Sequence, residues 1–459
     1  MGKFGCKGLL LLGSMMLWGG AAQAQYLRSS YFMEGTSARL QLNPGLQPTR
    51  GYFNVPIIGS FNMSASSNVL GTSDIIDVLD AGDDLFSNDK LFDRLKTDNR
   101  LNVNLNTDIL SFGWYKGKGF WSVNVGLRAD VGASIPSSMF EYLRDLSNFN
   151  NVNGGFSNMN FDMNAYAEVG LGYSRRLTEK LTVGGRVKVL LGIARAEMAV
   201  DNFEIKGVPQ NPENSYNWRN VQASATMNAH VSTTMKGGGL SFDDNYYGGS
   251  RYLDGFDFGD GSFGIAGAGF GVDLGASYKV WDNLTVSAAV LDLGFINWKG
   301  SETVTASPEE TSISVNENNY QDFLDEDFLS MDRFKLVENT EPSKSVKKSL
   351  AATILLAGEY GLFNNKLSVG AMYSSRFVKP KALNELTFLA TYRPKNWLNA
   401  AISYSPIQAS GKSIGLAVKL GPLFVGTDYM FFGGNSKSVN GFLGISFPLG
   451  GKAKPFSEL

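Results

Sequence analysis

The strongest constraint on the fold of this chain is an alternation of apolar and polar residues that recurs along most of its length. In Leu181–Ile193 apolar side chains occupy most odd positions, while Thr182, Arg186 and Lys188 fall between them. Successive side chains of a strand point to opposite faces, so each such segment predicts a strand with one apolar and one polar face. The pattern recurs in residues 121–128, 270–279, 352–360, 367–373, 386–392, 400–404, 414–420, 423–429 and 439–447.

Aromatic residues at the ends of these segments favour a membrane barrel over a soluble β-sandwich, which would also alternate. The apolar face closes on an aromatic ring at Tyr173, Tyr278, Tyr360, Tyr373, Tyr392, Tyr404, Tyr429 and Phe447, and Trp281, Trp298 and Trp397 stand close to strand ends. Membrane barrels carry aromatic girdles at both water interfaces. The sequence therefore predicts an all-β fold, a transmembrane antiparallel β-barrel whose apolar face meets lipid.

The connections between the segments set the strand count. Barrels of this type have short turns on the periplasmic side and long loops outside. Short connections at residues 115–119, 175–180, 281–283, 363–365, 394–396 and 421–422 alternate with longer polar stretches, mainly 64–100, 132–161, 199–265 and 299–350. With the first strand at Gly51–Ser64, the last at Val439–Phe447, and Val221–Val231 as a hairpin within an outer loop, about 14 strands result.

Two irregularities interrupt the alternation. Pro56 lies inside the first predicted strand, where it lacks the N–H that a ladder hydrogen bond needs. At Ala288-Ala289 the alternation slips, so that Asp292 would face lipid in a regular strand. We expect bulges or kinks at both places.

The first residues have the form of a cleaved secretory signal, residues 1–24. Lys3 and Lys7 flank the start of an apolar run, and Ala22-Gln23-Ala24 suits the cleavage site. Beyond it no run of eighteen apolar residues could form a membrane-spanning helix, so we expect a barrel in a Gram-negative type outer membrane. Cys6, the only cysteine, is removed with the signal. We therefore expect neither disulfides nor thiolate metal sites. Removal of the signal changes the net charge from −2 to −4, and this lack of positive charge argues against a nucleic-acid partner.

Motifs for catalysis and metal binding are weak. Residues 411–415 match G-x-S-x-G, but an alternating strand follows where that motif needs a helix, and the single histidine, His230, falls in a loop. We therefore expect neither enzyme activity nor a cofactor. Asp254, Asp257 and Asp260 lie among glycines in an outer loop; they are either solvated turn residues or a calcium site without EF-hand spacing.

Charged residues on the polar faces of the strands form a set that the fold would turn toward the lumen. They are Arg128, Glu168, Arg186, Lys188, Glu359 and Arg393, joined by Asp273, Lys279, Arg376, Lys419 and Asp428. They either pair to fill a narrow barrel or line a conducting pathway.

Two outer stretches carry apolar residues at helical spacing. Ser73 precedes Ile75, Ile76 and Leu79, and Ser137 precedes Met139, Phe140, Leu143 and Leu146. Such faces pack on the barrel mouth, capture an apolar ligand or dock a protein partner.

The stretch before the first strand adds a family resemblance. Residues 38–45, Ala-Arg-Leu-Gln-Leu-Asn-Pro-Gly, resemble the Asn-Pro-Ala hatch of the fourteen-stranded FadL-type long-chain fatty acid transporters, with Gly45 in place of the alanine. Residues 291–298 and 134–136 resemble an uncharacterised group of FadL-related barrels, itself similar to the PorV-like barrels of type IX secretion.

The resemblance implies an N-terminal plug or hatch at residues 25–50, a barrel at 51–447, a periplasmic tail at 448–459 and a lateral route for apolar molecules. Its ligand-binding candidates are Asn43, Pro44, Ile75, Leu79, Phe140, Leu143 and Leu146. The implied function is uptake or movement of hydrophobic small molecules in contact with outer-membrane lipid. The alternative is a barrel subunit or anchor of a secretion or assembly complex, with protein partners at the outer loops.

Overall fold

A computed structural model describes most of the chain: residues 28–33, 36–69, 71, 92–147, 153–207, 222–243, 251–257, 264–316, 318, 334–378, 382–395, 397–408, 412–428 and 437–452. The predicted signal peptide and the helix predicted after Ser73 lie outside these residues. The helical elements are η1 (Arg28–Phe32), α2 (Ala38–Leu42), α5 (Ser137–Ser147) and η3 (Gly300–Glu302). Within the described ranges, no helix has both the length and the apolar character to cross a bilayer.

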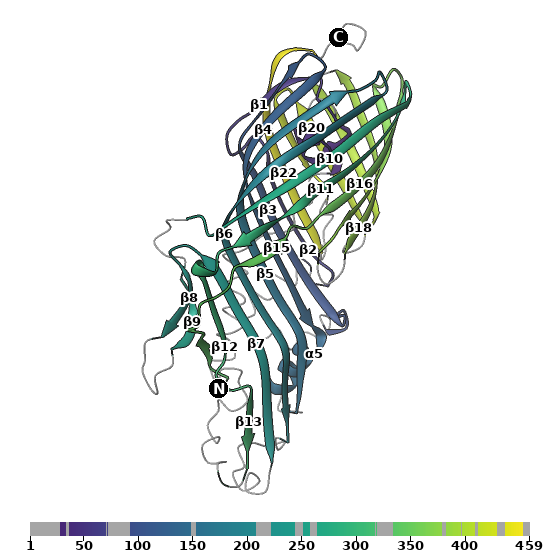
Figure 1. Ribbon diagram of the computed structural model, residues 1–459. Coiled ribbons are helices and arrows are strands. Elements are labelled where there is room, and N and C mark those ends of the chain that lie inside the picture. The colour runs from purple at the N-terminus through teal and green to yellow at the C-terminus, as the bar shows by residue number, and fades with distance from the viewer. Residues whose placement is uncertain are drawn as a thin grey trace.

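The strands close into an antiparallel barrel of 14 strands, which confirms the predicted fold class (Figure 1). In order around the wall they are β1 (Arg50–Asn54) with β2 (Phe61–Ser67), β3 (Asp98–Lys116), β4 (Gly119–Pro136), β5 (Gly154–Arg176), β6 (Leu181–Lys206), β10 (Gly267–Trp281), β11 (Leu284–Trp298), β16 (Thr353–Leu362), β17 (Leu367–Arg376), β18 (Leu383–Lys395), β19 (Leu398–Ile407), β20 (Ser413–Leu420), β21 (Leu423–Thr427) and β22 (Ser438–Lys452). Because β22 pairs with β1 and β2, and both pair with β3, the wall has no open edge.

The outer face of the barrel carries the apolar side chains that the alternation predicted. On β6 the valines Val187 and Val189 are 49% and 50% exposed, whereas Arg186 and Lys188, which alternate with them, are buried inside the barrel. Aromatic rings near the strand ends are also exposed outward: Tyr173, Tyr278, Tyr360, Tyr373, Tyr392, Tyr404, Phe447, Trp281 and Trp397. An exposed apolar belt on a closed barrel is stable only against lipid, so this is a transmembrane barrel.

Both predicted irregularities occur, but the second lies three residues further along the chain than predicted. The first wall strand breaks into β1 and β2 around Pro56, and Ile57 adopts a positive φ of 69° in the turn between them. The slip in β11 is a bulge at Asp292 (φ 58°), where the register with β10 shifts between Val272 and Leu274. Ala288 and Ala289 pair regularly. The bulge turns the Asp292 carboxylate away from lipid to Lys188 inside the barrel.

Two predictions at strand ends are wrong. Trp298 is not a girdle residue: it is 1% exposed and packs with Tyr166, Leu190 and Ile296, because β11 continues past the lipid belt into a covered region. The last strand continues beyond Phe447 to Lys452, since Arg50 and Gly51 of β1 extend its ladder. The tail predicted to begin at residue 448 therefore begins later.

The outer side carries a folded module where long loops were predicted. Strands β4, β5 and β6 extend into the predicted loops at 132–161 and 199–265, because their alternation continues beyond the membrane. The barrel part of β6 pairs with β10, and its outer part pairs with β7 (Ala223–Met235), the segment predicted not to span. The remaining outer strands are β8 (Gly239–Asp243), β9 (Tyr252–Asp257), β12 (Thr303–Pro308), β13 (Ser312–Val315), β14 (Leu336–Glu338) and β15 (Val346–Ser349).

This module has its own hydrophobic core. Met139 and Tyr142 of α5 pack on Phe156 of β5 and on Phe203 of β6, and Val315 of β13 closes the cluster. Figure 1 shows the module extending from one end of the barrel. The fourth predicted loop, 299–350, likewise contains η3 and strands β12 to β15.

Candidate functional site

The N-terminal segment, residues 28–48, lies inside the barrel and contacts its wall on opposite sides (Figure 1). Arg28 forms an ion pair of 2.8 Å with Glu385 on β18, and its backbone N–H donates to Asp428 at 2.6 Å. The Tyr31 hydroxyl lies 2.8 Å from the Ser287 hydroxyl on β11, and the Gln41 amide donates to Asp108 on β3. The segment therefore acts as a cross-brace, by which we mean that it spans the lumen and links several strands of the wall. It is almost wholly buried.

Residues Asn43-Pro44-Gly45 lie flat against strands β6 and β10. The Asn43 amide donates to the carbonyls of Ala276 and Ala288 at 3.3 and 3.2 Å, and its oxygen accepts from the Gly45 N–H at 2.8 Å. Such close approach explains the glycine at position 45, because a Cβ there would come within 2.9 Å of the Ala276 backbone.

The wall opposite this turn is also built of glycine. A Cβ on Gly184 of β6 would lie 2.2 Å from the Pro44 carbonyl oxygen, and one on Gly275 of β10 would lie 2.0 Å from the Asn43 amide oxygen. Both distances are well inside van der Waals contact. The two glycines thus form a recess in the wall that fits the Asn-Pro-Gly turn.

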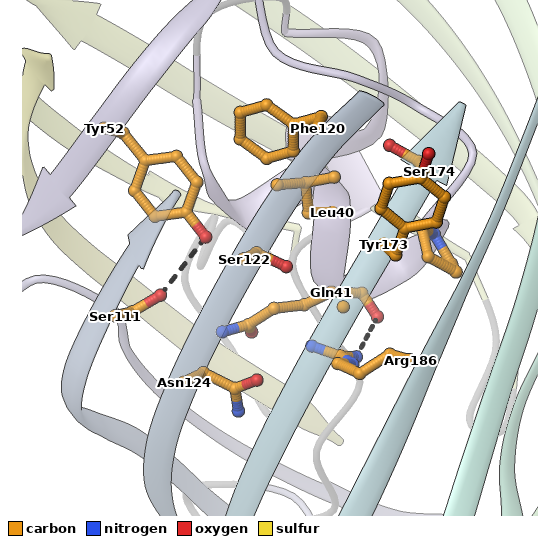
Figure 2. Close-up of a pocket in the computed structure, with 12 residues that line it drawn as sticks. Leu40, Gln41, Tyr52, Ser111, Phe120, Ser122, Asn124, Tyr173, Ser174 and Arg186 are labelled. Carbon is orange, nitrogen blue, oxygen red and sulfur yellow. Dashed lines mark hydrogen bonds between the residues drawn. The ribbon is translucent and has the colours of Figure 1, made fainter. Parts of the chain in front are cut away.

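A small cavity remains beside the segment, between its helix α2 and strands β3 to β6 (Figure 2). Its volume is about 10 Å³, close to the room that one water molecule needs. The Tyr52 and Ser111 hydroxyls lie 3.3 Å apart at its edge, and Arg186 donates to the Gln41 carbonyl at 3.4 Å. This space has room for about one water molecule and is too small for an organic ligand.

A buried charge cluster, which we call the lumen cluster, fills the β3 to β11 side of the barrel. Its members are Asp108, Arg128, Glu168, Arg186, Lys188, Asp273 and Asp292. Lys188 is central: its ammonium lies 2.5 Å from Asp292, 2.8 Å from Asp273 and 3.7 Å from Glu168. Arg128 bridges Asp108 and Glu168, while Arg186 holds Asp273 at 2.6 Å.

Further ion pairs lie elsewhere in the lumen. Arg393 of β18 lies 2.7 Å from Glu359 of β16 and donates to the Phe32 carbonyl at 3.2 Å. Arg376 of β17 reaches Asp130 of β4 at 2.9 Å, which joins two walls that are far apart in strand order. All six lumen charges of the principal set predicted from the sequence take part in ion pairs inside the barrel.

Apolar side chains line the other side of the lumen. Leu291, Leu355, Met372 and Leu389, from β11, β16, β17 and β18, point inward and form what we call the apolar stripe. Tyr31, Phe32, Leu42 and Leu46 of the N-terminal segment cover it. The two sides of the lumen therefore differ in chemistry, one charged and one apolar.

The ligand-binding candidates of the sequence do not form one site. Asn43 and Pro44 lie on the barrel wall, whereas Phe140 is buried on α5 in the outer module. Its neighbour Tyr142 packs in the module core, and burial raises the pKa of the Tyr142 hydroxyl. This part of α5 thus serves packing. Ile75 and Leu79, and the side chains of Leu143 and Leu146, lie outside what the structure describes.

The possible calcium residues give no support for a metal site. Asp254 and Asp257 are exposed residues of β9, and Asp260 lies outside the described residues. Within the described ranges no three histidine, cysteine or carboxylate side chains gather in a way that could hold a metal.

Some site residues were missed in the sequence. Asp108 faces the lumen because a register shift follows it in β3, and Arg28 and Glu385 are far apart in the chain. Only the polar face of β18, which carries Glu385, offered a signal.

Comparison with protein families identifies the family of the chain. A family model described as a family of unknown function (DUF5723) matches residues 44–428. The chain belongs to this family. The match begins at Pro44 of the Asn-Pro-Gly turn and covers most of the wall of this DUF5723 barrel. No curated protein matches the sequence.

Solved structures similar to the DUF5723 barrel include two toluene transporters and a FadL homologue. The toluene transporter TbuX of Ralstonia pickettii has 11% identity and a TM-score of 0.42, over 92% of this chain and 94% of that one. The toluene transporter TodX of Pseudomonas putida has 10% identity and a TM-score of 0.38, over 93% and 94%. A FadL homologue of Pseudomonas aeruginosa has 9% identity and a TM-score of 0.36, over 93% and 97%.

Proposed function

We propose that this barrel moves hydrophobic small molecules across the outer membrane, with residues 25–50 as a displaceable plug. The apolar stripe carries the proposal. The interior of membrane barrels is polar as a rule, yet here four neighbouring strands present Leu291, Leu355, Met372 and Leu389 to the lumen. A barrel that served only to pair charges would have no use for such a surface.

The N-terminal segment that covers the apolar stripe can leave it without breaking the barrel wall. The N-terminal segment adds no strand to the wall; it is held by side-chain packing, by the Arg28 ion pair and by the Asn43 hydrogen bonds. A shift of the segment would leave an apolar surface on one side of the lumen and the lumen cluster on the other. Apolar molecules would then travel along the stripe.

A disulfide lock tests the plug. The Ser37 hydroxyl of the segment donates to the Asn54 side chain of β1 at 2.9 Å, so these two side chains face each other and are the positions chosen for a cysteine pair. We expect the oxidised Ser37→Cys/Asn54→Cys variant to lose uptake of a fluorescent long-chain fatty acid in proteoliposomes, and a reductant to restore it.

The Ser37→Cys single variant under the same oxidant is the control and should transport like the wild type. Equal uptake by locked and reduced protein would show that the segment stays in place during transport. Wild-type uptake no faster than that of empty liposomes would remove the transport proposal itself.

The outer module favours a second candidate, a subunit or anchor of a secretion or assembly complex. The module has a core of its own and extends well beyond the lipid belt, which suits a docking role. Purification in mild detergent followed by mass spectrometry separates the two. Stoichiometric apolar ligand supports transport, whereas a defined set of proteins without ligand supports the complex.

A further inference from the structure

The lipid-facing wall has a hollow, and we propose that it holds one phospholipid of the periplasmic leaflet. The hollow lies across strands β10, β11, β16, β17 and β18 and has a volume of about 560 Å³. Most of its outward lining is apolar: Ala276, Tyr278, Val286, Ala288, Leu356, Gly358, Ala371, Tyr373 and Leu386.

The floor of the hollow consists of small residues in two paired rows. Ala276 lies opposite Ala288 across the β10–β11 ladder, and Gly358 lies opposite Ala371 across the β16–β17 ladder. A Cβ placed on Gly358 would have no atom within 4 Å, so the space above it is open. Bulky neighbours rise on both sides, among them Tyr278 and Leu356, which are 43% and 50% exposed.

The position of the hollow decides what fills it. Its lining side chains belong to the same outward faces as the apolar belt, so the hollow is continuous with the lipid interface. Gly358 and Ala371 each lie five residues from the nearer end of the Phe363–Lys366 turn that joins β16 to β17. Short turns lie on the periplasmic side of such barrels. Hydrocarbon of the periplasmic leaflet therefore occupies the hollow, because open apolar surface inside a bilayer is filled by acyl chains.

The turns beside the hollow suit a phosphate headgroup. Lys366 in the β16–β17 turn and Lys395 at the end of β18 are exposed, and neither turn carries a carboxylate among its described residues. Asp282 lies in the β10–β11 turn, on the other side of the hollow, so its negative charge is separated from these two lysines. Phe363, 76% exposed, and Trp397, 53% exposed, give the same turns interfacial aromatic anchors. The apolar floor suits an acyl chain, and the basic rim formed by Lys366 and Lys395 suits an anionic headgroup.

Photo-crosslinking tests this site without requiring transport. The full barrel is placed in nanodiscs with phosphatidylglycerol that carries a diazirine on its acyl chain, and the labelled residues are mapped by mass spectrometry. We expect labelling to concentrate on β11, β16 and β17 at the hollow. Gly358→Leu should lower it to the level of the rest of the belt, because the added side chain fills the open space above Gly358.

Gly441→Leu is the matched control, since Gly441 of β22 likewise has open space above it. It should leave labelling at the hollow unchanged. Labelling spread evenly around the belt, or equal in the Gly358→Leu variant and the wild type, would overturn the site. A free fatty acid probe that labels as strongly as phosphatidylglycerol, with no effect of Lys366→Gln/Lys395→Gln, would overturn the headgroup assignment. None of these outcomes depends on movement of the N-terminal segment.

Discussion

Replacing Lys188 with methionine is expected to destabilise the barrel by about 3–5 kcal/mol, the cost of removing one partner from a buried ion pair. The Lys188 ammonium contacts Glu168, Asp273 and Asp292, and no other cation of the lumen cluster contacts Asp292. Methionine keeps much of the side-chain volume but leaves these carboxylates without their shared cation. Urea unfolding of the barrel in lipid vesicles, followed by tryptophan fluorescence, measures the change.

Two further variants make this prediction specific. Lys180→Met removes an exposed lysine from the β5–β6 turn and should change stability by no more than about 0.5 kcal/mol. Adding Asp292→Asn to Lys188→Met should recover part of the loss, because one unpaired charge disappears. A Lys188→Met barrel as stable as the Lys180→Met barrel would mean that the cluster is hydrated and does not need its central cation.

Gly184→Ala is expected to displace the Asn-Pro-Gly turn from the wall and to make the barrel leaky. The added Cβ would lie 2.2 Å from the Pro44 carbonyl oxygen, and backbone cannot yield as the tip of a side chain can. Overpacking of this kind costs about 1–3 kcal/mol, which shifts the balance between seated and displaced segment about 5- to 150-fold. Entry of a small dye into proteoliposomes, measured as a rate, reports the displacement.

The neighbouring glycine supplies the control. Gly185 faces outward, and a Cβ there would have its nearest neighbours at 3.5 Å, an ordinary contact. Gly185→Ala should therefore leave both the dye rate and the barrel stability as in the wild type. If both variants leak alike, the leak comes from strand β6 itself; if neither leaks, the turn does not close the lumen.

Alternation predicted the barrel but failed where strands leave the membrane. In β10 and in β16 to β22 the apolar faces are bounded by turns and, in most of these strands, by an aromatic ring, so lipid and lumen faces were assigned correctly. In β5 and β6 the same period continues into the outer module, whose soluble core needs the same two-faced strands. Periodicity cannot distinguish lipid from protein as the cover of an apolar face. The ends of these strands, and the burial of Trp298, were therefore missed.

The site was predictable only in part, for a related reason. Arg128, Glu168, Arg186 and Lys188 follow from the parity of regular strands. Asp292 enters the lumen only through a bulge, and the ion pair of Arg28 with Glu385 joins residues that no local pattern connects. The match of Asn43 and Pro44 to glycines on β6 and β10 depends on backbone distances that the sequence does not contain.

The cross-brace of the N-terminal segment also bears on the order of assembly. Arg28 needs Glu385 of β18 and Asp428 beyond β21, and Tyr31 needs Ser287 of β11. These partners come together only after nearly the whole chain has entered the wall, and contacts between such distant residues form late because closing the intervening loop costs entropy. We therefore expect the segment that comes first in the described chain to be seated last, after the wall has closed around the lumen.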